Sequence, residues 1–154
     1  MQDIGLIGLA VMGQNLVLNM AEKGWRVSVF NRTTLKVEDF IARKPKELPI
    51  LGFSDLGEFL KSLSCPRKVM LMVKAGAPVD ELIGQILPFL EQGDVLIDGG
   101  NSDFKDTERR VKYLEEKGIL FLGVGVSGWP VEPGGIATAG VLWRHHSQQL
   151  PAWP

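Results

Sequence analysis

Short apolar runs alternate along the chain with stretches in which apolar residues recur at helical spacing. The run at residues 4–7 (Ile-Gly-Leu-Ile) ends at Gly8, and Met12, Leu16 and Met20 then follow at four-residue intervals. The first pattern is typical of a short buried strand and the second of an amphipathic helix. The start of the chain therefore predicts a strand, a turn and a helix.

The same alternation continues to residue 126. It predicts further strands at residues 25–30, 50–52, 69–73, 95–97 and 119–126, and helices at residues 37–42, 55–63, 78–90 and 103–117. Ser54 is the candidate cap of the helix at 55–63, and if the loop before the helix at 103–117 is only a tight turn, Ser102 or Asp103 would cap that helix. Six strands that alternate with five helices need crossover connections, which are right-handed and cover the sheet. The sequence therefore predicts an α/β fold, a doubly wound parallel sheet of the Rossmann type with helices on both faces.

The alternation stops at Trp129. Residues 129–154 contain three of the four tryptophans, both histidines and four of the nine prolines, but only two charged residues. Prolines at this density prevent most regular structure. We predict a folded domain over residues 1–128 and an atypical, ill-ordered tail over residues 129–154.

Composition narrows the class of protein. With 17 basic and 18 acidic residues in 154, the net charge of −1 provides no field that would attract nucleic acid or an anionic membrane. No apolar run approaches the roughly 18 residues of a membrane helix, and the first residues lack a secretory signal. Cys65 is the single cysteine, which suits a reducing compartment, and we expect it to be a small filler before Pro66. A cytoplasmic domain is the expectation.

Ligands of doubly wound sheets bind at the carboxyl ends of the strands. The first predicted strand is followed by Gly8, Leu9, Ala10, Val11, Met12 and Gly13, a G-x-A-x-x-G sequence. Gly8 permits a tight turn, Ala10 permits close approach of a pyrophosphate, and Gly13 permits close packing of helix on strand. The free N–H groups of the helix start then face the phosphates. A compact strand-helix turn without a ligand is the alternative, but the position in the first strand-helix-strand unit favours dinucleotide binding.

The second predicted strand is followed by Asn31, Arg32 and Thr33. An NAD-selective site usually has an acidic residue here, which accepts hydrogen bonds from the ribose 2′-hydroxyl and would repel a 2′-phosphate. A guanidinium can instead pair with that phosphate bidentately, so the sequence favours NADP over NAD. The alternative is a polar turn in which Thr33 or Thr34 caps the next helix.

Three later strand ends also carry candidate residues. Val73, Lys74 and Ala75 combine small side chains with one cation, although Lys74 is equally typical of a solvated loop. Asn101 follows two glycines and offers an amide donor and acceptor. After the last predicted strand, the Ser127 hydroxyl and the Gly128 N–H are candidates to hold a carboxylate or phosphate.

Five motifs in order resemble the decarboxylating 6-phosphogluconate dehydrogenase family: residues 7–16, 31–33, 73–76, 98–102 and 125–128. The resemblance covers residues 1–128 and corresponds to the family's amino-terminal coenzyme domain. It implies that residues 8–13 hold the pyrophosphate of NADP, residues 31–33 its 2′-phosphate end, and residues 73–75 its middle. It further implies that Asn101 contacts nicotinamide and substrate, and that Ser127 and Gly128 begin the substrate loop.

The resemblance also implies the reaction. The family oxidises 6-phosphogluconate at C3 by hydride transfer to NADP and then decarboxylates it to ribulose 5-phosphate, in the pentose phosphate pathway and without a metal. Trp129 stands where the family has a second glycine, and the sequence has no counterpart of the helical domain that supplies the catalytic lysine, the acidic proton donor and the homodimer contacts. We therefore expect no catalytic residue in this chain, weak or no binding of 6-phosphogluconate, and negligible turnover.

Two alternatives stay open at this stage. The first alternative is a non-catalytic NADP-binding module whose aromatic tail docks a partner. The second is a fragment of an NAD-dependent β-hydroxyacid dehydrogenase. Asn31 in place of an acidic residue and the run at 98–102 argue against the second alternative. His145 and His146 are adjacent in the proline-rich tail, where a positioned acid or base is not expected, and we predict that they face solvent.

Overall fold

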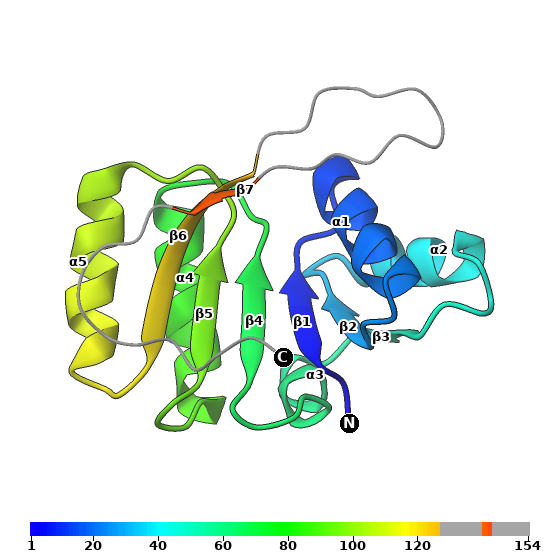
Figure 1. The fold of residues 1–154 in the computed structure, drawn as a ribbon, viewed down its shortest axis with the longest axis horizontal. Helices are drawn as coiled ribbons and strands as arrows, with labels where there is room; N and C mark the ends of the chain where they lie inside the picture. The colour runs from blue at the N-terminus through cyan, green and yellow to red at the C-terminus, as the bar shows by residue number, and fades with distance from the viewer. Residues whose placement is uncertain (127–139, 143–154) are drawn as a thin grey trace.

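The structure, a computed structural model, describes residues 1–126 and the backbone of residues 140–142 (Figure 1). Its elements in chain order are β1 (Ile4–Ile7), α1 (Val11–Glu22), β2 (Val27–Phe30), α2 (Thr34–Arg43), β3 (Ile50–Phe53), α3 (Leu56–Lys61), β4 (Lys68–Leu71), α4 (Ala77–Ile86), the 3-10 turn η1 (Leu87–Phe89), β5 (Val95–Asp98), α5 (Phe104–Glu115), β6 (Leu120–Val126) and β7 (Gly140–Leu142).

The strands form one sheet in the order β3-β2-β1-β4-β5-β6-β7. Pairing from β3 through to β6 is parallel throughout, and β1 pairs with both β2 and β4. The chain therefore builds outward from β1 in one direction and then returns to build outward from β4 in the other. This reversal is the topological switch point of a doubly wound fold, so the predicted fold class is confirmed.

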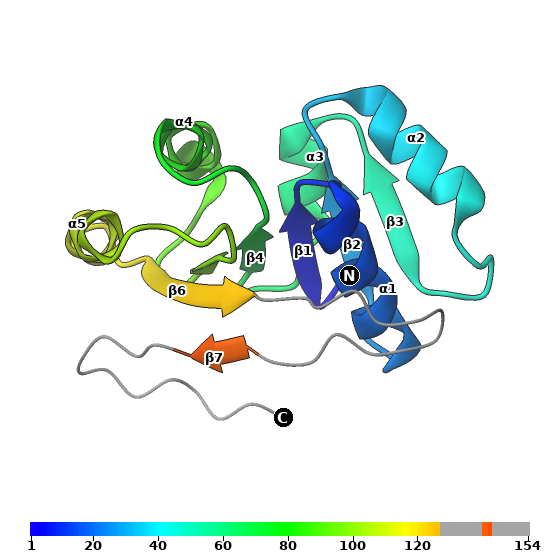
Figure 2. The ribbon, with the colours of Figure 1, turned by 90° about the horizontal axis from the view of Figure 1, so that it is seen from above.

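Helices cover both faces of the sheet (Figure 2), and one apolar core lies beneath each layer of helices. On one face α1 and α2 cover the sheet, and Leu6 of β1 is buried beneath them. On the other face α3, α4 and α5 cover it, and the next residue of β1, Ile7, is buried there. Consecutive side chains of a strand point to opposite faces, so β1 is buried on both sides and contains only apolar residues and glycine.

The stripe of α1 that is fully buried lies one residue beyond the one that the spacing of large apolar residues indicates. Gly13, Val17 and Ala21 are buried, Leu16 and Met20 are partly buried against the same core, and Met12 is 39% exposed. Small residues on the sheet-facing side let the helix axis approach the strands closely. Met12 is consequently left at the edge of the fold, above the carboxyl ends of the strands.

Several predicted boundaries differ from the observed ones for local reasons. Helix α3 is capped by Asp55, whose side chain accepts a hydrogen bond from the Glu58 N–H at 2.8 Å, so the prediction of Ser54 was wrong. The helix predicted at 78–90 ends at Ile86 and continues as η1, which contains Pro88, a residue without an N–H for the α-helical ladder. Asp103 caps α5, because its side chain accepts a hydrogen bond from the Lys105 N–H. It was one of the two candidate caps named from the sequence.

Other predicted positions shift by two to three residues. The second strand begins at Val27 rather than at residue 25, the second helix begins at Thr34 rather than at residue 37, and the fourth strand ends at Leu71 rather than at residue 73. Cys65, which we expected to be a small filler before Pro66, is exposed.

The tail falls largely outside the described residues. The predicted disorder of residues 129–154, the candidate residues Ser127 and Gly128, and the expectations for Trp129, His145 and His146 all belong to that part of the chain, apart from the backbone of β7. Strand β7 pairs antiparallel with β6, with Leu142 opposite Val124, and no sequence pattern predicted it. Within the described residues, none of the helices has the length and apolar character needed to span a bilayer.

The Phe59 side chain tests the core beneath β1. It is fully buried, its ring lies 5.9 Å from that of Phe30 and 6.3 Å from that of Phe53, and a Cβ on Gly5 would meet it at 2.5 Å. We expect Phe59→Ala to lower the free energy of unfolding by about 3–5 kcal/mol in urea titrations. Phe104→Ala, which alters a phenylalanine that is 65% exposed, is the control and should change it by less than about 0.5 kcal/mol. Equal losses in both variants would contradict this account of the core.

Candidate functional site

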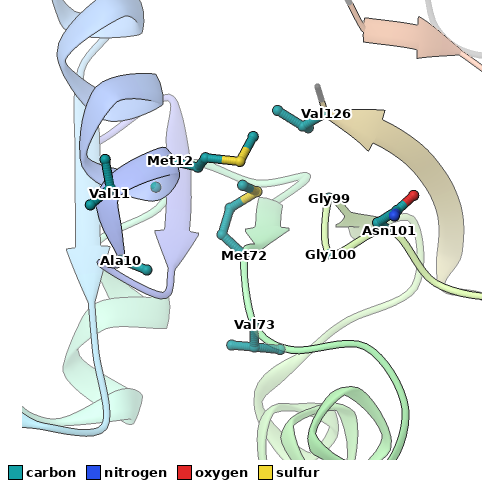
Figure 3. A pocket seen from close by; sticks show the side chains of 10 residues that line it. Ala10, Val11, Met12, Met72, Val73, Gly99, Gly100, Asn101 and Val126 are labelled. Atoms are coloured by element: carbon teal, nitrogen blue, oxygen red, sulfur yellow. The ribbon is translucent and has the colours of Figure 1, made fainter. Parts of the chain in front are cut away.

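A cleft of about 520 Å³ opens at the carboxyl ends of β1, β4, β5 and β6, at the switch point of the sheet (Figure 3). Its lining consists of Ala10, Val11, Met12, Gly13, Met72, Val73, Gly99, Gly100, Asn101 and Val126. The fold thus brings together residues from three of the predicted loops. Arg32 and Thr33 are exposed beyond the end of β2 and do not line the cleft itself.

The loop after β1 is shaped by close backbone approach. Gly8 has φ +109°, and a Cβ there would lie 2.2 Å from the Met72 carbonyl oxygen. A Cβ on Gly13 would lie 2.0 Å from the Gly8 carbonyl oxygen. Neither position has room for a side chain, so both glycines have the steric roles that the sequence indicates.

The start of α1 is open toward the cleft. Ala10 is its N-cap residue, provides no side-chain cap, and is followed by a first turn without acidic residues. The N–H groups of the first turn have no partners within a helix, and they carry the positive end of its dipole. Together with the small residues beside them, they form an arrangement suited to a phosphate group.

Asn31 connects the first two loops. Its Oδ1 accepts a hydrogen bond from the Leu9 N–H at 3.0 Å, and its Nδ2 donates one to the Thr33 carbonyl oxygen at 3.2 Å. The neighbouring Gly8 N–H donates to the Phe30 carbonyl oxygen at 3.0 Å. The Asn31 amide thus holds the glycine loop against the end of β2, a role that the sequence did not reveal, and its Nδ2 retains a second N–H.

Arg32 and Thr33 follow as exposed residues. Thr33 is the N-cap residue of α2, but its hydroxyl makes no capping hydrogen bond. The alternative in which this threonine serves as a side-chain cap therefore lacks its expected contact. Among residues 31–33 the side chains are neutral or positive, which leaves this strand end favourable to an anion.

The loops after β4 and β5 meet across the cleft floor. Val73 lines the cleft, Lys74 is exposed and Ala75 is half-buried. A Cβ on Gly100 would lie 2.3 Å from the Val73 carbonyl oxygen, so the two loops touch through their backbones. Asn101, with φ +60°, adopts the left-handed conformation that asparagine tolerates, and it is one of the residues that line the cleft (Figure 3).

A buried carboxylate fixes the second of these loops. Asp98, at the end of β5, accepts a hydrogen bond from the Gly100 N–H at 2.9 Å and another from the Ser102 hydroxyl. Arg110 of α5 lies beside this pair, 3.2 Å from the Ser102 Oγ, and also bonds both carboxylate oxygens of Asp80. Sequence reasoning missed Arg110. The available signal was its place four residues before Leu114, on the apolar face of a charged helix.

Comparison with known proteins identifies the family. The family model described as the NAD binding domain of 6-phosphogluconate dehydrogenase matches residues 3–134. The chain belongs to this family. The resemblance inferred from the five motifs is therefore confirmed.

Named relatives agree with this assignment. The chain is 63% identical over 126 residues to a decarboxylating 6-phosphogluconate dehydrogenase of Chlamydia pneumoniae, a match that covers 82% of this chain and 26% of the relative. It is 59% identical over 126 residues to decarboxylating 6-phosphogluconate dehydrogenase 1 of Saccharomyces cerevisiae, with the same coverage. The chain thus spans about a quarter of the length of these curated relatives, and the match lies in their coenzyme domain.

Solved structures give the same picture. Plasmodium falciparum 6-phosphogluconate dehydrogenase, studied alone, with its cofactor NADP+ and with its substrate 6-phosphogluconate, superposes with a TM-score of 0.77 at 49% identity, over 82% of this chain and 27% of that one. Mycobacterium tuberculosis 3-hydroxyisobutyrate dehydrogenase superposes with a TM-score of 0.69 at 22% identity, over 83% of this chain and 41% of that one. The second likeness concerns the fold alone.

Asp80 makes the stability of this 6-phosphogluconate dehydrogenase domain depend on acid pH. Its pKa is lowered from 3.8 to about 2, chiefly by hydrogen bonds from Arg110 and then from Arg109, against the effect of burial. A folded-state pKa below the unfolded one stabilises the fold above about pH 4, and this contribution is lost as the pH falls toward 2.

We therefore expect Asp80→Asn to be less stable than the unsubstituted chain at pH 7, with a gap that narrows between about pH 4 and pH 2 in urea titrations. Glu81→Gln removes an adjacent, exposed carboxylate and should follow the unsubstituted chain throughout. A gap for Asp80→Asn that stays constant down to pH 3 would contradict the assigned pKa.

Proposed function

We propose that this chain is the NADP-binding part of a decarboxylating 6-phosphogluconate dehydrogenase. One observation carries the proposal: the open N-terminus of α1 at the switch point lies next to a β2 end that has an exposed arginine and no carboxylate. The first feature suits a pyrophosphate and the second a phosphorylated ribose. Relatives that are decarboxylating 6-phosphogluconate dehydrogenases, one of them solved with NADP+, support the same conclusion.

The geometry of the cleft supports a residue-by-residue assignment. Residues 8–13 would hold the pyrophosphate through backbone N–H groups. The two positions where this loop lies closest to other backbone, Gly8 and Gly13, have no side chain. Arg32 and Thr33 would hold the 2′-phosphate, with Asn31 fixing their loop to the glycine loop. Val73, Lys74 and Ala75 would lie along the middle of the coenzyme, and Asn101 beside the nicotinamide.

The chemistry supplied by bound NADP+ is acceptance of a hydride. The residues of this chain would bind and orient the coenzyme, and the Asn101 amide would donate and accept hydrogen bonds where nicotinamide and 6-phosphogluconate meet. Ser127 and Gly128 would contact 6-phosphogluconate. We assign no acid or base of the decarboxylation to residues 1–126, and we propose that homodimerisation, as in the family, involves residues beyond them. The lone cysteine suits work in the cytoplasm.

Nucleotide selectivity tests the proposal. In fluorescence titrations of the full chain, we expect a submillimolar Kd for NADPH and a Kd for NADH at least about tenfold higher, because one charge-assisted contact to the 2′-phosphate accounts for such a ratio. Tighter binding of NADH than of NADPH would contradict the assignment of NADP.

Arg32 is the residue on which that selectivity should depend. We expect Arg32→Ala to raise the Kd for NADPH about 10- to 100-fold and to leave the Kd for NADH unchanged, because only NADPH carries the 2′-phosphate. Lys46→Ala removes an exposed cation from the connection that follows α2 and serves as the matched control. An equal effect of both substitutions on NADPH would show a general charge effect and would count against a specific contact at Arg32.

A further inference from the structure

Arg110 is the charged side chain with the least solvent exposure among the arginines and lysines of the described residues, at 1%. Its guanidinium donates from Nε to Asp80 Oδ1 at 2.9 Å and from Nη2 to Asp80 Oδ2 at 3.1 Å. It also donates from Nη1 to Ser102 Oγ at 3.2 Å and from Nη2 to the Gly76 carbonyl oxygen at 3.1 Å. Asp98 Oδ2 lies 3.6 Å from Nη1.

These partners come from different segments of the chain. Asp80 belongs to α4, Gly76 is the residue that ends the loop after β4, and Ser102 and Asp98 belong to the loop after β5 and to the end of that strand. A single planar guanidinium therefore joins the two loops to each other. A lysine ammonium has three donors on one atom and cannot reach these separated acceptors at once.

The two joined loops are the ones that line one side of the cleft. Val73 lies at the start of the first loop and contributes to the lining, and Gly76 at its end is bonded to Arg110. Gly99, Gly100 and Asn101 lie between Asp98 and Ser102, which both face the guanidinium. The positions of the lining residues thus depend on a side chain that does not itself line the cleft.

We propose that Arg110 is a positioning residue that holds the loops at 73–76 and 98–102 in the arrangement that the nicotinamide half of the coenzyme requires. This inference rests on the proposed function for the identity of the ligand. The adenosine half depends on other contacts, namely the glycine loop, the Asn31 link and Arg32, and Arg110 bonds none of these. The two halves of the ligand should consequently respond differently when Arg110 is changed.

Arg109 provides a matched control on the same helix. It is 56% exposed and shares Asp80 as a partner, with Nη2 at 3.0 Å from Oδ2, and it also pairs with Asp106. Within the described residues it makes no hydrogen bond or ion pair to either cleft loop. Arg109→Met therefore removes the same charge and two hydrogen bonds to Asp80 while leaving the loop contacts of Arg110 in place.

The experiment compares Arg110→Lys, Arg110→Met and Ser102→Ala with Arg109→Met, using the full chain. Two probes are titrated: NADPH, and adenosine 2′,5′-bisphosphate, which lacks the nicotinamide half. We expect the Arg110 variants to raise the Kd for NADPH at least tenfold and Ser102→Ala to raise it about three- to tenfold, with the Kd for the bisphosphate within twofold of the unsubstituted chain. Arg109→Met should leave both Kd values within twofold.

Amide hydrogen exchange without nucleotide gives a second readout. Exchange at residues 74–77 and 99–102 should be faster in Arg110→Lys and Ser102→Ala than in Arg109→Met, while exchange at residues 8–13 stays unchanged. Ser102→Ala retains the buried charges of Arg110 and Asp98. It therefore tests the same loop contact even if Arg110→Met does not fold.

Three results are decisive. Equal loss of affinity for NADPH and for the bisphosphate, or unchanged exchange in both loops, would overturn the positioning role and leave Arg110 as a general stabilising residue. If the unsubstituted chain binds neither probe, the proposed function fails, and the exchange comparison still decides whether Arg110 positions the loops.

Discussion

At the carboxyl end of β1, three stretches of backbone approach one another so closely that no side chain fits between them. The Met72 carbonyl would meet a Cβ on Gly8 at 2.2 Å, and the Gly8 carbonyl would meet a Cβ on Gly13 at 2.0 Å. This approach lets α1 start directly above the sheet and lets β1 pair with β2 on one side and β4 on the other. The cleft and its open helix N-terminus follow from this packing.

The two sides of the cleft are held by different polar contacts. On the side of β2, the amide of Asn31 ties the glycine loop to the next strand end. On the side of β5, the buried pair of Asp98 and Arg110 ties the loops after β4 and β5 together. Burial of such charges is tolerated because their donors and acceptors are bonded, and loss of one partner leaves the other uncompensated. A site with two separately supported halves matches a ligand that itself has two nucleotide halves.

The sequence predicted the features that depend on local patterning. The doubly wound parallel sheet could be anticipated from the alternating elements, and the glycine loop from the spacing of Gly8 and Gly13, because both follow from general connection and steric rules. The buried stripe of α1 was not evident, because its members are small and Met12 gives the stronger apolar signal.

Contacts between residues distant in the chain were also missed. Arg110 looked like one more charge on a charged helix, since its partners Asp80 and Gly76 lie 30 and 34 residues away. The link from Asn31 to Leu9, 22 residues apart, likewise exists only after β1 and β2 have paired. Local spacing reports which loops gather at a sheet edge, and the folded structure is needed to show which side chains hold them.

The central claim is that a dinucleotide bridges the loop after β1 and the loop after β5. Amide chemical-shift changes during titration of the isotopically labelled chain with NADP+ test it most directly. The account predicts the largest changes at residues 9–13, 32–33 and 99–101. Little change is expected at the opposite edge of the sheet, where residues 46–49 and 91–94 precede the amino ends of β3 and β5. Large changes confined to that opposite edge, or no changes at saturating NADP+, would contradict it.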